Sequence, residues 1–397
     1  MQAARPHLQT SVAQSGAQAG GWLSNWREQW CAWRDRRLIS PEFQRHAART
    51  WYLRPLARRR ARALFDLVAG FVYSQVLLAC VRVHAFEILA EGPQSLDELA
   101  VRFDLPLTAA ERLLDAAASL ELVEHRSGGR YGLGKLGAPM VGNESIAAMV
   151  EHHSVLYADL RDPLALLRGQ GEAPALSRYW SYAESKVPGE LPRAEVDAYS
   201  ALMSASQPLV AQQILDAYAL GGHRCLLDVG GGQGRFLVAA GQRNPGLRLM
   251  LFDLPAVVAP ARAAFEAFGL GERAQVFGGD FSRDPLPAGA DVASLVRVIY
   301  DHGDERALSL LRAVHRALPP GGTLLLAEPM AGAPGAPRMG DAYFGMYLLA
   351  MRGGRPRTAA ELAALLRTAG FEQVRELATP IPLQVGVLVC RRGETMA

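Results

Sequence analysis

The feature that most constrains the fold is an alternation of apolar strands and amphipathic helices from Arg224 onward. Helical segments are predicted to begin at Gly234, Ala256, Asp304 and Thr358, between strands at 225–230, 247–253, 274–279, 291–299 and 323–328. Such alternation predicts a parallel sheet in an α/β domain. Segments 371–378 and 383–390 are separated by four residues, too few for a crossover helix, so the chain should finish with an antiparallel strand.

A glycine-rich turn, LLDVGGGQGRF, links the first strand to its helix and contains Gly230 and Gly232. Glycine allows positive φ and a close approach of the backbone to a ligand. The helix N-terminus that follows favours negative charge. The spacing is similar to the dinucleotide fingerprint, so a nicotinamide-dependent enzyme is one interpretation of this turn.

Polar residues follow the next strands at the same edge of the predicted sheet. Asp253 ends the second strand, where an acid can bind ribose hydroxyls, and Asp280 and Phe281 end the third, where they could receive an adenine. Arg297 is predicted in the fourth strand, where it could lie over the adenine. Open α/β sheets bind ligands at this edge.

Residues 86–136 predict a small winged helix-turn-helix unit. Ser95–Glu98 and Thr108–Glu111 each read as a capping box that opens a short helix, and a turn at Gly128 separates two short strands. This shape often reads the DNA major groove. The second helix carries Glu111, Arg112 and Asp115, which is not a basic face, so no nucleic-acid partner is expected.

Several motifs in order resemble those of S-adenosylmethionine-dependent O-methyltransferases of the plant caffeate and bacterial polyketide type: LLDVGGGQGRF, LFDLPAVV, GGDF, RVIYDHGDE, PPGGTLLLAE and RTAAELAALLRTAGFEQV. The resemblance implies a Rossmann-like class I methyltransferase domain, preceded by an α-helical winged-helix dimerisation domain, and a homodimer without a metal. It implies that S-adenosylmethionine binds through Gly230 and Gly232 at its methionine moiety, Asp253 at its ribose, and Asp280, Phe281 and Arg297 at its adenine.

The expected organisation has four parts. A basic, Trp- and Arg-rich extension covers residues 1–62, the dimerisation domain covers 63–145, bridging helices cover 146–220, and the methyltransferase domain covers 221–397.

The chain departs from the family where a proton must be removed. The family's His-Asp-Trp run, whose histidine is the general base, is here Tyr300, Asp301 and His302. His302 is one residue late, and a shift of one residue at a strand end points a side chain the opposite way. Glu328 matches the first of two acids that orient the family's histidine, but Pro356 stands in place of the second.

This departure suits an aliphatic alcohol better than an acidic phenol as the methyl acceptor. Tyr300 could position such a hydroxyl, and Asp301, His302 or Glu328 could accept its proton. An apolar helix over 341–351 predicts the acceptor pocket, although such a stripe is also typical of a core. The predicted pocket residues are Met203, Tyr343, Phe344, Met346 and Tyr347.

The combination resembles one branch of the family, the acyclic carotenoid O-methyltransferases of purple phototrophic bacteria. These act in spheroidene biosynthesis for photosynthesis and methylate the tertiary 1-hydroxyl of hydroxyneurosporene and demethylspheroidene. A hydrophobic acceptor is therefore expected. An O-methyltransferase of a phenolic or polyketide product is the alternative, and a DNA-binding regulator on the same fold is a further one.

The N-terminal region concentrates positive charge and tryptophan. Residues 5–62 hold twelve arginines against three acidic residues, a net charge of +9, whereas the whole chain carries +3. Trp22, Trp26, Trp30 and Trp33 share one helical face. This face suits peripheral contact with an anionic membrane or a partner subunit, and both interpretations stay open.

The cellular location is predicted from the same region and from the cysteines. The apolar run 64–81 is predicted to be a buried core helix rather than a membrane span. Four scattered cysteines indicate a reducing compartment and no structural metal. The expected location is cytoplasmic, with the extension at the inner or intracytoplasmic membrane if it binds lipid.

Overall fold

The structure is a computed structural model that describes residues 21–179, 207–333, 338–381 and 385–393. It divides into two compact units, Met1–Val76 and Leu77–Ala397. The boundary between these units, like the one predicted at residue 62, falls inside a single long helix. Met203, a predicted pocket residue, lies outside the described residues.

The first unit consists of helices. They are α1 (Gly21–Ile39), α2 (Pro41–Arg49) and most of α3 (Arg54–Arg82). The predicted helix over the tryptophans is confirmed, and Trp26, Trp30 and Trp33 are each about half exposed or more. Arg34 lies over the ring of Trp30, and Arg37 over that of Trp33, at 5.6 and 5.3 Å.

The prediction that residues 64–81 form a buried core helix is wrong. Helix α3 is long and apolar enough to cross a bilayer by length and composition, yet only 11% of its most apolar window is buried. Leu78 and Cys80 are buried near its end. The apolar side chains further up the helix are between 58 and 75% exposed: Leu64, Phe65, Leu67, Val68, Phe71 and Val72. An apolar run in the sequence indicates that a helix face is to be buried, but it does not indicate whether the same chain, another chain or lipid buries it.

The winged unit opens the second compact unit and is confirmed. It contains α4 (Ala85–Ala90), α5 (Leu96–Arg102) and α6 (Leu107–Ser119), with a sheet of order β1-β3-β2 built from β1 (Gln94–Ser95), β2 (Val123–Arg126) and β3 (Arg130–Leu133). Ser95 and Glu98 form the predicted capping box. The one predicted at Thr108 is wrong, because Pro106 caps α6 and Thr108 already lies in its first turn.

Helices bridge this unit to the large sheet. Described elements are η1 (Ala138–Met140), α7 (Glu144–Asp159), α8 (Pro163–Leu167), α9 (Ala175–Tyr179) and a helix at 207–217. Asn143 caps α7 by accepting from the amide of Ile146, and Asp162 caps α8 in the same way from Ala165.

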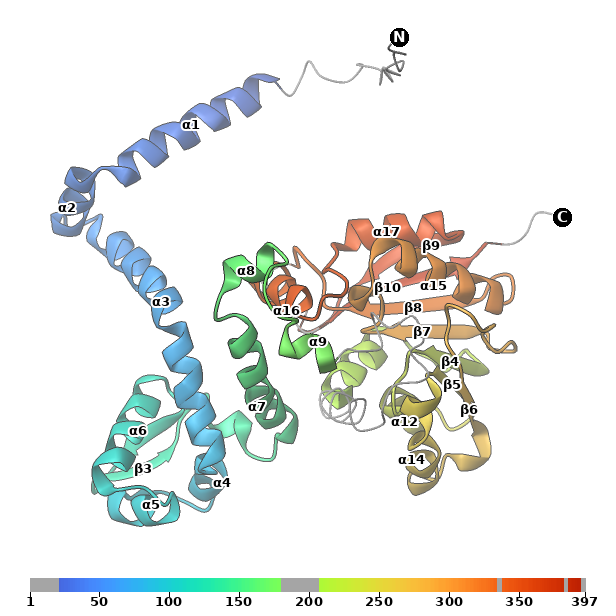
Figure 1. The fold of residues 1–397 in the computed structure, drawn as a ribbon, viewed down its shortest axis with the longest axis horizontal. Helices are drawn as coiled ribbons and strands as arrows, with labels where there is room; N and C mark the ends of the chain where they lie inside the picture. The colour runs from blue at the N-terminus through green and yellow to red at the C-terminus, as the bar shows by residue number, and fades with distance from the viewer. Residues whose placement is uncertain (1–20, 180–206, 334–337, 382–384, 394–397) are drawn as a thin grey trace, which may run out of the picture. The chain divides into compact units, whose positions relative to one another are not determined.

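The large sheet has seven strands in the order β6-β5-β4-β7-β8-β10-β9 (Figure 1). The strands are β4 (Cys225–Val229), β5 (Arg248–Asp253), β6 (Ala274–Gly278), β7 (Val292–Val296), β8 (Thr323–Glu328), β9 (Phe371–Leu377) and β10 (Gly386–Arg392). The strands from β4 to β8 pair in parallel, and β10 pairs antiparallel with both β8 and β9, as predicted.

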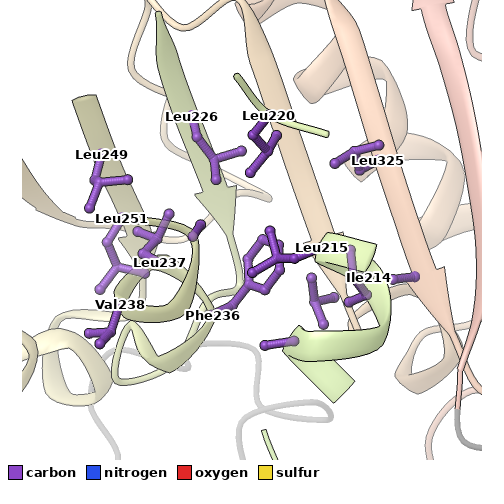
Figure 2. Close-up of a cluster of buried hydrophobic side chains, with 14 of the residues drawn as sticks. Ile214, Leu215, Leu220, Leu226, Phe236, Leu237, Val238, Leu249, Leu251 and Leu325 are labelled. Atoms are coloured by element: carbon purple, nitrogen blue, oxygen red, sulfur yellow. The ribbon is translucent and has the colours of Figure 1, made fainter. Parts of the chain in front are cut away.

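Helices cover both faces of this sheet. The helix at 207–217, α12 (Arg235–Arg243) and α14 (Ala261–Ala267) bury one face, where Phe236 and Leu215 lie together in a cluster that also contains Leu226 and Leu251 (Figure 2). Helices α15 (Asp304–Ala317) and α17 (Ala359–Thr368) bury the other face. Shorter elements are α13 (Pro255–Val258), η3 (Gly271–Arg273), η4 (Ile299–Asp301), η5 (Arg338–Phe344, a π-helix) and α16 (Gly345–Ala350).

Two predicted strands end earlier than expected. Strand β7 stops at Val296, so Arg297 follows the strand instead of belonging to it. Arg297 has φ of 56°, a left-handed conformation that ends an extended run. Strand β6 stops at Gly278, so Asp280 and Phe281 lie in the loop beyond it.

Candidate active site

The glycine-rich turn between β4 and α12 is tightly packed but open at one position. Gly230, Gly232 and Gly234 all have positive φ, at 71°, 60° and 77°. A Cβ on Gly230 would lie 2.8 Å from the side chain of Val298, so this glycine is required by packing. A Cβ on Gly232 would meet nothing within 4 Å, so its backbone faces open space where a ligand can approach.

Asp253 is fixed beside this turn by two backbone amides. Gly232 N donates to Oδ2 at 2.8 Å and Leu254 N donates to Oδ1 at 2.7 Å. Burial raises the pKa of Asp253 to about 6, although these hydrogen bonds oppose the shift. A carboxylate oxygen can accept more than one hydrogen bond, so the held carboxylate can still receive two vicinal hydroxyls. The turn and this carboxylate therefore fit a nucleoside cofactor.

Asp228 is a buried acid that the sequence interpretation missed. It lies inside β4, where Oδ1 accepts a 2.6 Å hydrogen bond from Ser294, and Oδ2 has no hydrogen-bond partner among the described residues. Burial raises its pKa to about 7. The signal was present in the sequence, since one carboxylate interrupts the otherwise apolar run CLLDV.

The loop after β6 brings a second set of residues to the same edge. Asp280 Oδ1 accepts from the amide of Ser282 at 2.9 Å. The guanidinium carbon of Arg306 lies 5.3 Å from the centroid of the Phe281 ring. The centroid of the His302 ring lies 5.4 Å from the same point. Arg306 is thus the cation beside Phe281, whereas Arg297 donates to Gln207 at 2.8 Å.

Tyr300 and His302 have different neighbours on the 299–302 turn. Tyr300 is 5% exposed and its ring makes an edge contact with Phe344, at 6.1 Å between centroids. His302 is buried against Phe281, and burial together with Arg306 and Arg357 lowers its pKa to about 3. The two side chains therefore contact different parts of the site, Tyr300 at the aromatic helix and His302 at the loop after β6.

Two carboxyl groups are buried behind this turn. Glu328 Oε1 accepts from the amides of Val298 and Ile299 at 3.1 and 2.7 Å. Burial raises the pKa of Glu328 to about 8. Burial and the neighbouring Glu328 raise the pKa of Asp301 well above its usual value. Glu328 is therefore protonated at neutral pH and a poor proton acceptor, and the raised pKa of Asp301 disfavours its ionised form.

The run 353–358, where the family's second acid would stand, holds the turn through backbone contacts and an arginine. Arg355 N donates to the Tyr300 carbonyl at 2.9 Å. The buried guanidinium of Arg357 donates to the carbonyls of Ile299 and His302 at 3.0 and 2.7 Å, and to Asp304 at 2.8 Å. The sequence interpretation looked for an acid here and missed this arginine.

Aromatic residues surround the tyrosine side of the turn. Tyr343 and Phe344 end η5, and Tyr347 follows in α16, so all three predicted aromatic pocket residues gather with Tyr300 in one cluster. Met346, which directly precedes Tyr347 in the sequence, is half-buried. Helix α7 adds two histidines that were missed: His152 Nε2 lies 2.8 Å from the Tyr347 hydroxyl, and His153 stacks on Tyr343 at 5.6 Å.

Two family models match the chain. An O-methyltransferase domain matches residues 168–372, and an O-methyltransferase dimerisation domain matches residues 65–142. The second match begins within the exposed apolar part of α3 and supports a homodimer.

Curated relatives agree with these matches. The chain is 45% identical to demethylspheroidene O-methyltransferase of Cereibacter sphaeroides, over 85% of this chain and 88% of the relative. It is 42% identical to the enzyme of the same name from Rhodobacter capsulatus, over 85% of this chain and 84% of the relative.

A solved structure shares the fold. Human N-acetylserotonin methyltransferase in complex with S-adenosylmethionine superposes with a TM-score of 0.69 at 26% identity, covering 84% of this chain and 98% of that one. The chain therefore belongs to the O-methyltransferase family, as an enzyme that uses S-adenosylmethionine as its methyl donor.

Proposed function

We propose that the enzyme methylates the tertiary 1-hydroxyl of an acyclic carotenoid of the hydroxyneurosporene or demethylspheroidene type, in spheroidene biosynthesis. The observation that carries the proposal is the likeness to two demethylspheroidene O-methyltransferases over 85% of the chain. The site supports it, because Tyr300 stands among aromatic side chains where a phenol-methylating relative would carry a basic histidine. An apolar acceptor with an aliphatic hydroxyl suits such a pocket.

The roles of individual residues belong to the same proposal. Gly230 and Gly232 would hold the methionine part of the cofactor, Asp253 its ribose, and Asp280, Phe281 and Arg297 its adenine. Tyr300 would position the acceptor hydroxyl in line with the methyl group. Asp301, Glu328 and His302 would shape the turn around Tyr300, because burial raises the pKa of both carboxyls and His302 contacts Phe281 instead of the aromatic cluster. Met203, Tyr343, Phe344, Met346 and Tyr347 would line the acceptor.

Asp253→Ala should weaken S-adenosylmethionine binding by roughly 2–4 kcal/mol, because each hydrogen bond to a charged group is worth about 1.5–3 kcal/mol. Titration calorimetry measures this directly. Glu272→Ala is a control, since that exposed acid lies in η3, before β6, and not in the glycine-rich turn or the loop after β6. Equal affinities for Asp253→Ala and the unmodified enzyme would remove Asp253 from the cofactor site.

We also propose that the dimerisation, bridging and methyltransferase parts occupy residues 63–145, 146–220 and 221–397. The extension that precedes them, over residues 1–62, would make peripheral contact with anionic membrane on the cytoplasmic side. The exposed Trp26, Trp30 and Trp33 share a helix with Arg34 and Arg37. Indole rings prefer the headgroup level, and each basic residue near an anionic surface contributes about 1 kcal/mol.

One experiment tests both the acceptor and the membrane contact. Full-length enzyme and labelled S-adenosylmethionine should methylate a 1-hydroxycarotenoid supplied in anionic vesicles. Replacing Trp26, Trp30 and Trp33 together by alanine should slow this reaction about ten-fold, but leave the rate on detergent-solubilised carotenoid unchanged. Methylation of a phenol with no turnover of the carotenoid would contradict the proposed acceptor, and equal rates for both proteins on vesicles would contradict the membrane contact.

A further inference from the structure

His152 stands on the acceptor side of the site, although it comes from the bridging helix α7. Its Nε2 lies 2.8 Å from the hydroxyl of Tyr347, and the two rings are 6.0 Å apart. The imidazole is half-buried, and it reaches a residue 195 positions away in the chain. The contact therefore joins the bridging region to the helix that carries the aromatic pocket.

Tyr347 connects this histidine to the catalytic turn. It is 5% exposed and belongs to the same buried cluster as Tyr300. Burial and the neighbouring Tyr343 raise the pKa of Tyr347, which keeps the phenol protonated. A protonated phenol can accept one hydrogen bond while it donates another, so Tyr347 can pass a proton without ionising.

The other titratable groups around the turn are poorly suited to receive a proton on this side. Burial raises the pKa of Glu328 to about 8, so it carries a proton at neutral pH, and burial raises the pKa of Asp301 well above its usual value. His302 contacts Phe281 instead of the aromatic cluster that contains Tyr300. His152, by contrast, has its pKa lowered to about 4 by burial and by His153, so at neutral pH it is an uncharged imidazole.

We propose that His152, acting through the Tyr347 hydroxyl, takes up the proton that the acceptor hydroxyl loses during methyl transfer. The inference rests on the proposed alcohol acceptor. S-adenosylmethionine, when bound, supplies an electrophilic methyl group, whose bond to sulfur breaks with the electron pair on sulfur as the acceptor oxygen bonds to carbon. The acceptor proton moves to the Tyr347 oxygen as the Tyr347 proton moves to His152 Nε2, leaving an ether and an imidazolium that later releases its proton to water.

A weak base is sufficient for this step. An aliphatic alcohol is far too weak an acid to be deprotonated beforehand, so its proton leaves as the new carbon–oxygen bond forms. The protonated ether is a very strong acid, and even an imidazole with a lowered pKa accepts from it readily. His152 thus supplies the function of the family's displaced histidine from a different part of the chain, as a positioning and relay residue rather than one in contact with the substrate.

His152→Ala should lower kcat on the 1-hydroxycarotenoid about a hundred-fold, in the range of general-base effects. It should leave the calorimetric affinity for S-adenosylmethionine unchanged, and added imidazole should restore part of the rate by occupying the space left by the side chain. His152→Gln, which can still hydrogen bond but cannot carry the proton, should be similarly slow. Combining either His152 variant with Tyr347→Phe should lower kcat little further than Tyr347→Phe alone, because the substitutions at 152 and 347 interrupt the same relay.

A matched control and a spectroscopic measurement separate a relay from a structural role. His223→Gln removes an imidazole that also bonds a tyrosine hydroxyl, that of Tyr218 at 2.9 Å, but lies in the loop before β4, and it should keep the wild-type pH profile. Nitrogen NMR of histidine-labelled enzyme should show His152 uncharged from pH 6 to 8, beside His153, Tyr343 and Tyr347. Full activity of His152→Gln, a charged His152, or loss of rate without imidazole rescue would each overturn the proposal. If the unmodified enzyme leaves the carotenoid unmethylated, the proposed function fails instead.

Discussion

Gly354→Ala should reduce methyl transfer by at least about a hundred-fold while the protein still folds. Gly354 has φ of 67°, and a Cβ there would lie 1.9 Å from the carbonyl oxygen of Tyr300 and 2.5 Å from the carbonyl carbon of Asp301. These are backbone atoms, so no rotamer change relieves the overlap. The 299–302 turn must move away, and a displacement of about 1 Å at reacting groups can cost a hundred-fold in rate.

The control for this substitution is Gly321→Ala. Gly321 has nearly the same φ, 72°, but an added Cβ would meet nothing within 4 Å. It therefore carries the backbone strain of a left-handed alanine without the overlap, and it lies in the loop before β8, away from the turn. Steady-state rates should fall only for Gly354→Ala. Denaturant melts should show both variants folded, with a loss at Gly321 of about 1–3 kcal/mol from backbone strain alone and a larger loss at Gly354. Comparable rates for the two variants would show that the turn tolerates the added methyl group.

The cofactor half of the site was predictable because its chemistry leaves local marks in the sequence. A strand that ends in GGGQG needs a backbone that bends with positive φ, and three of those glycines do so. Asp253 ends its strand as predicted and meets that turn, since the carboxyl ends of parallel strands share one edge. The alternation of segments likewise predicted the sheet, including its antiparallel finish.

The acceptor half was not predictable in the same way, because its contacts join distant segments. Nothing near His152 in the sequence indicates that it reaches Tyr347. The turn at Ile299 is held by Arg357, which is 58 residues away. The strand over 291–299 was predicted too long because its β-branched residues continue past Val296, whereas the left-handed Arg297 ends it. Helix α3 was misread for a related reason, since its apolar residues lack cover within the described chain.

Arg357→Met should lower the free energy of unfolding by about 2–4 kcal/mol, because it removes a buried donor from two backbone carbonyls and from Asp304. The Arg357 side chain is 1% exposed and donates to the Ile299 and His302 carbonyls as well as to Asp304. Methionine fills a similar volume but leaves the His302 carbonyl without this donor, whereas the Ile299 carbonyl keeps the amide of His302. A buried unsatisfied acceptor costs about 1–3 kcal/mol. Denaturant titrations with an unchanged slope would measure the difference.

Arg355→Met is the matched control, because Arg355 stands two residues earlier in the same run but is 45% exposed. Its ion pairs with Glu361 and Asp304 lie at the surface, where such pairs contribute at most about 1 kcal/mol.

Measuring stability at low pH distinguishes the ion pair of Arg357 with Asp304 from its hydrogen bonds to the backbone carbonyls. Arg357 lowers the pKa of Asp304, so the stability from that pair is present at neutral pH and is lost as the pH falls through the lowered pKa. The bonds to the carbonyls do not titrate with Asp304, so Arg357→Met should remain the less stable variant in acid. Equal losses for Arg357→Met and Arg355→Met at neutral pH would mean that this arginine does not hold the turn.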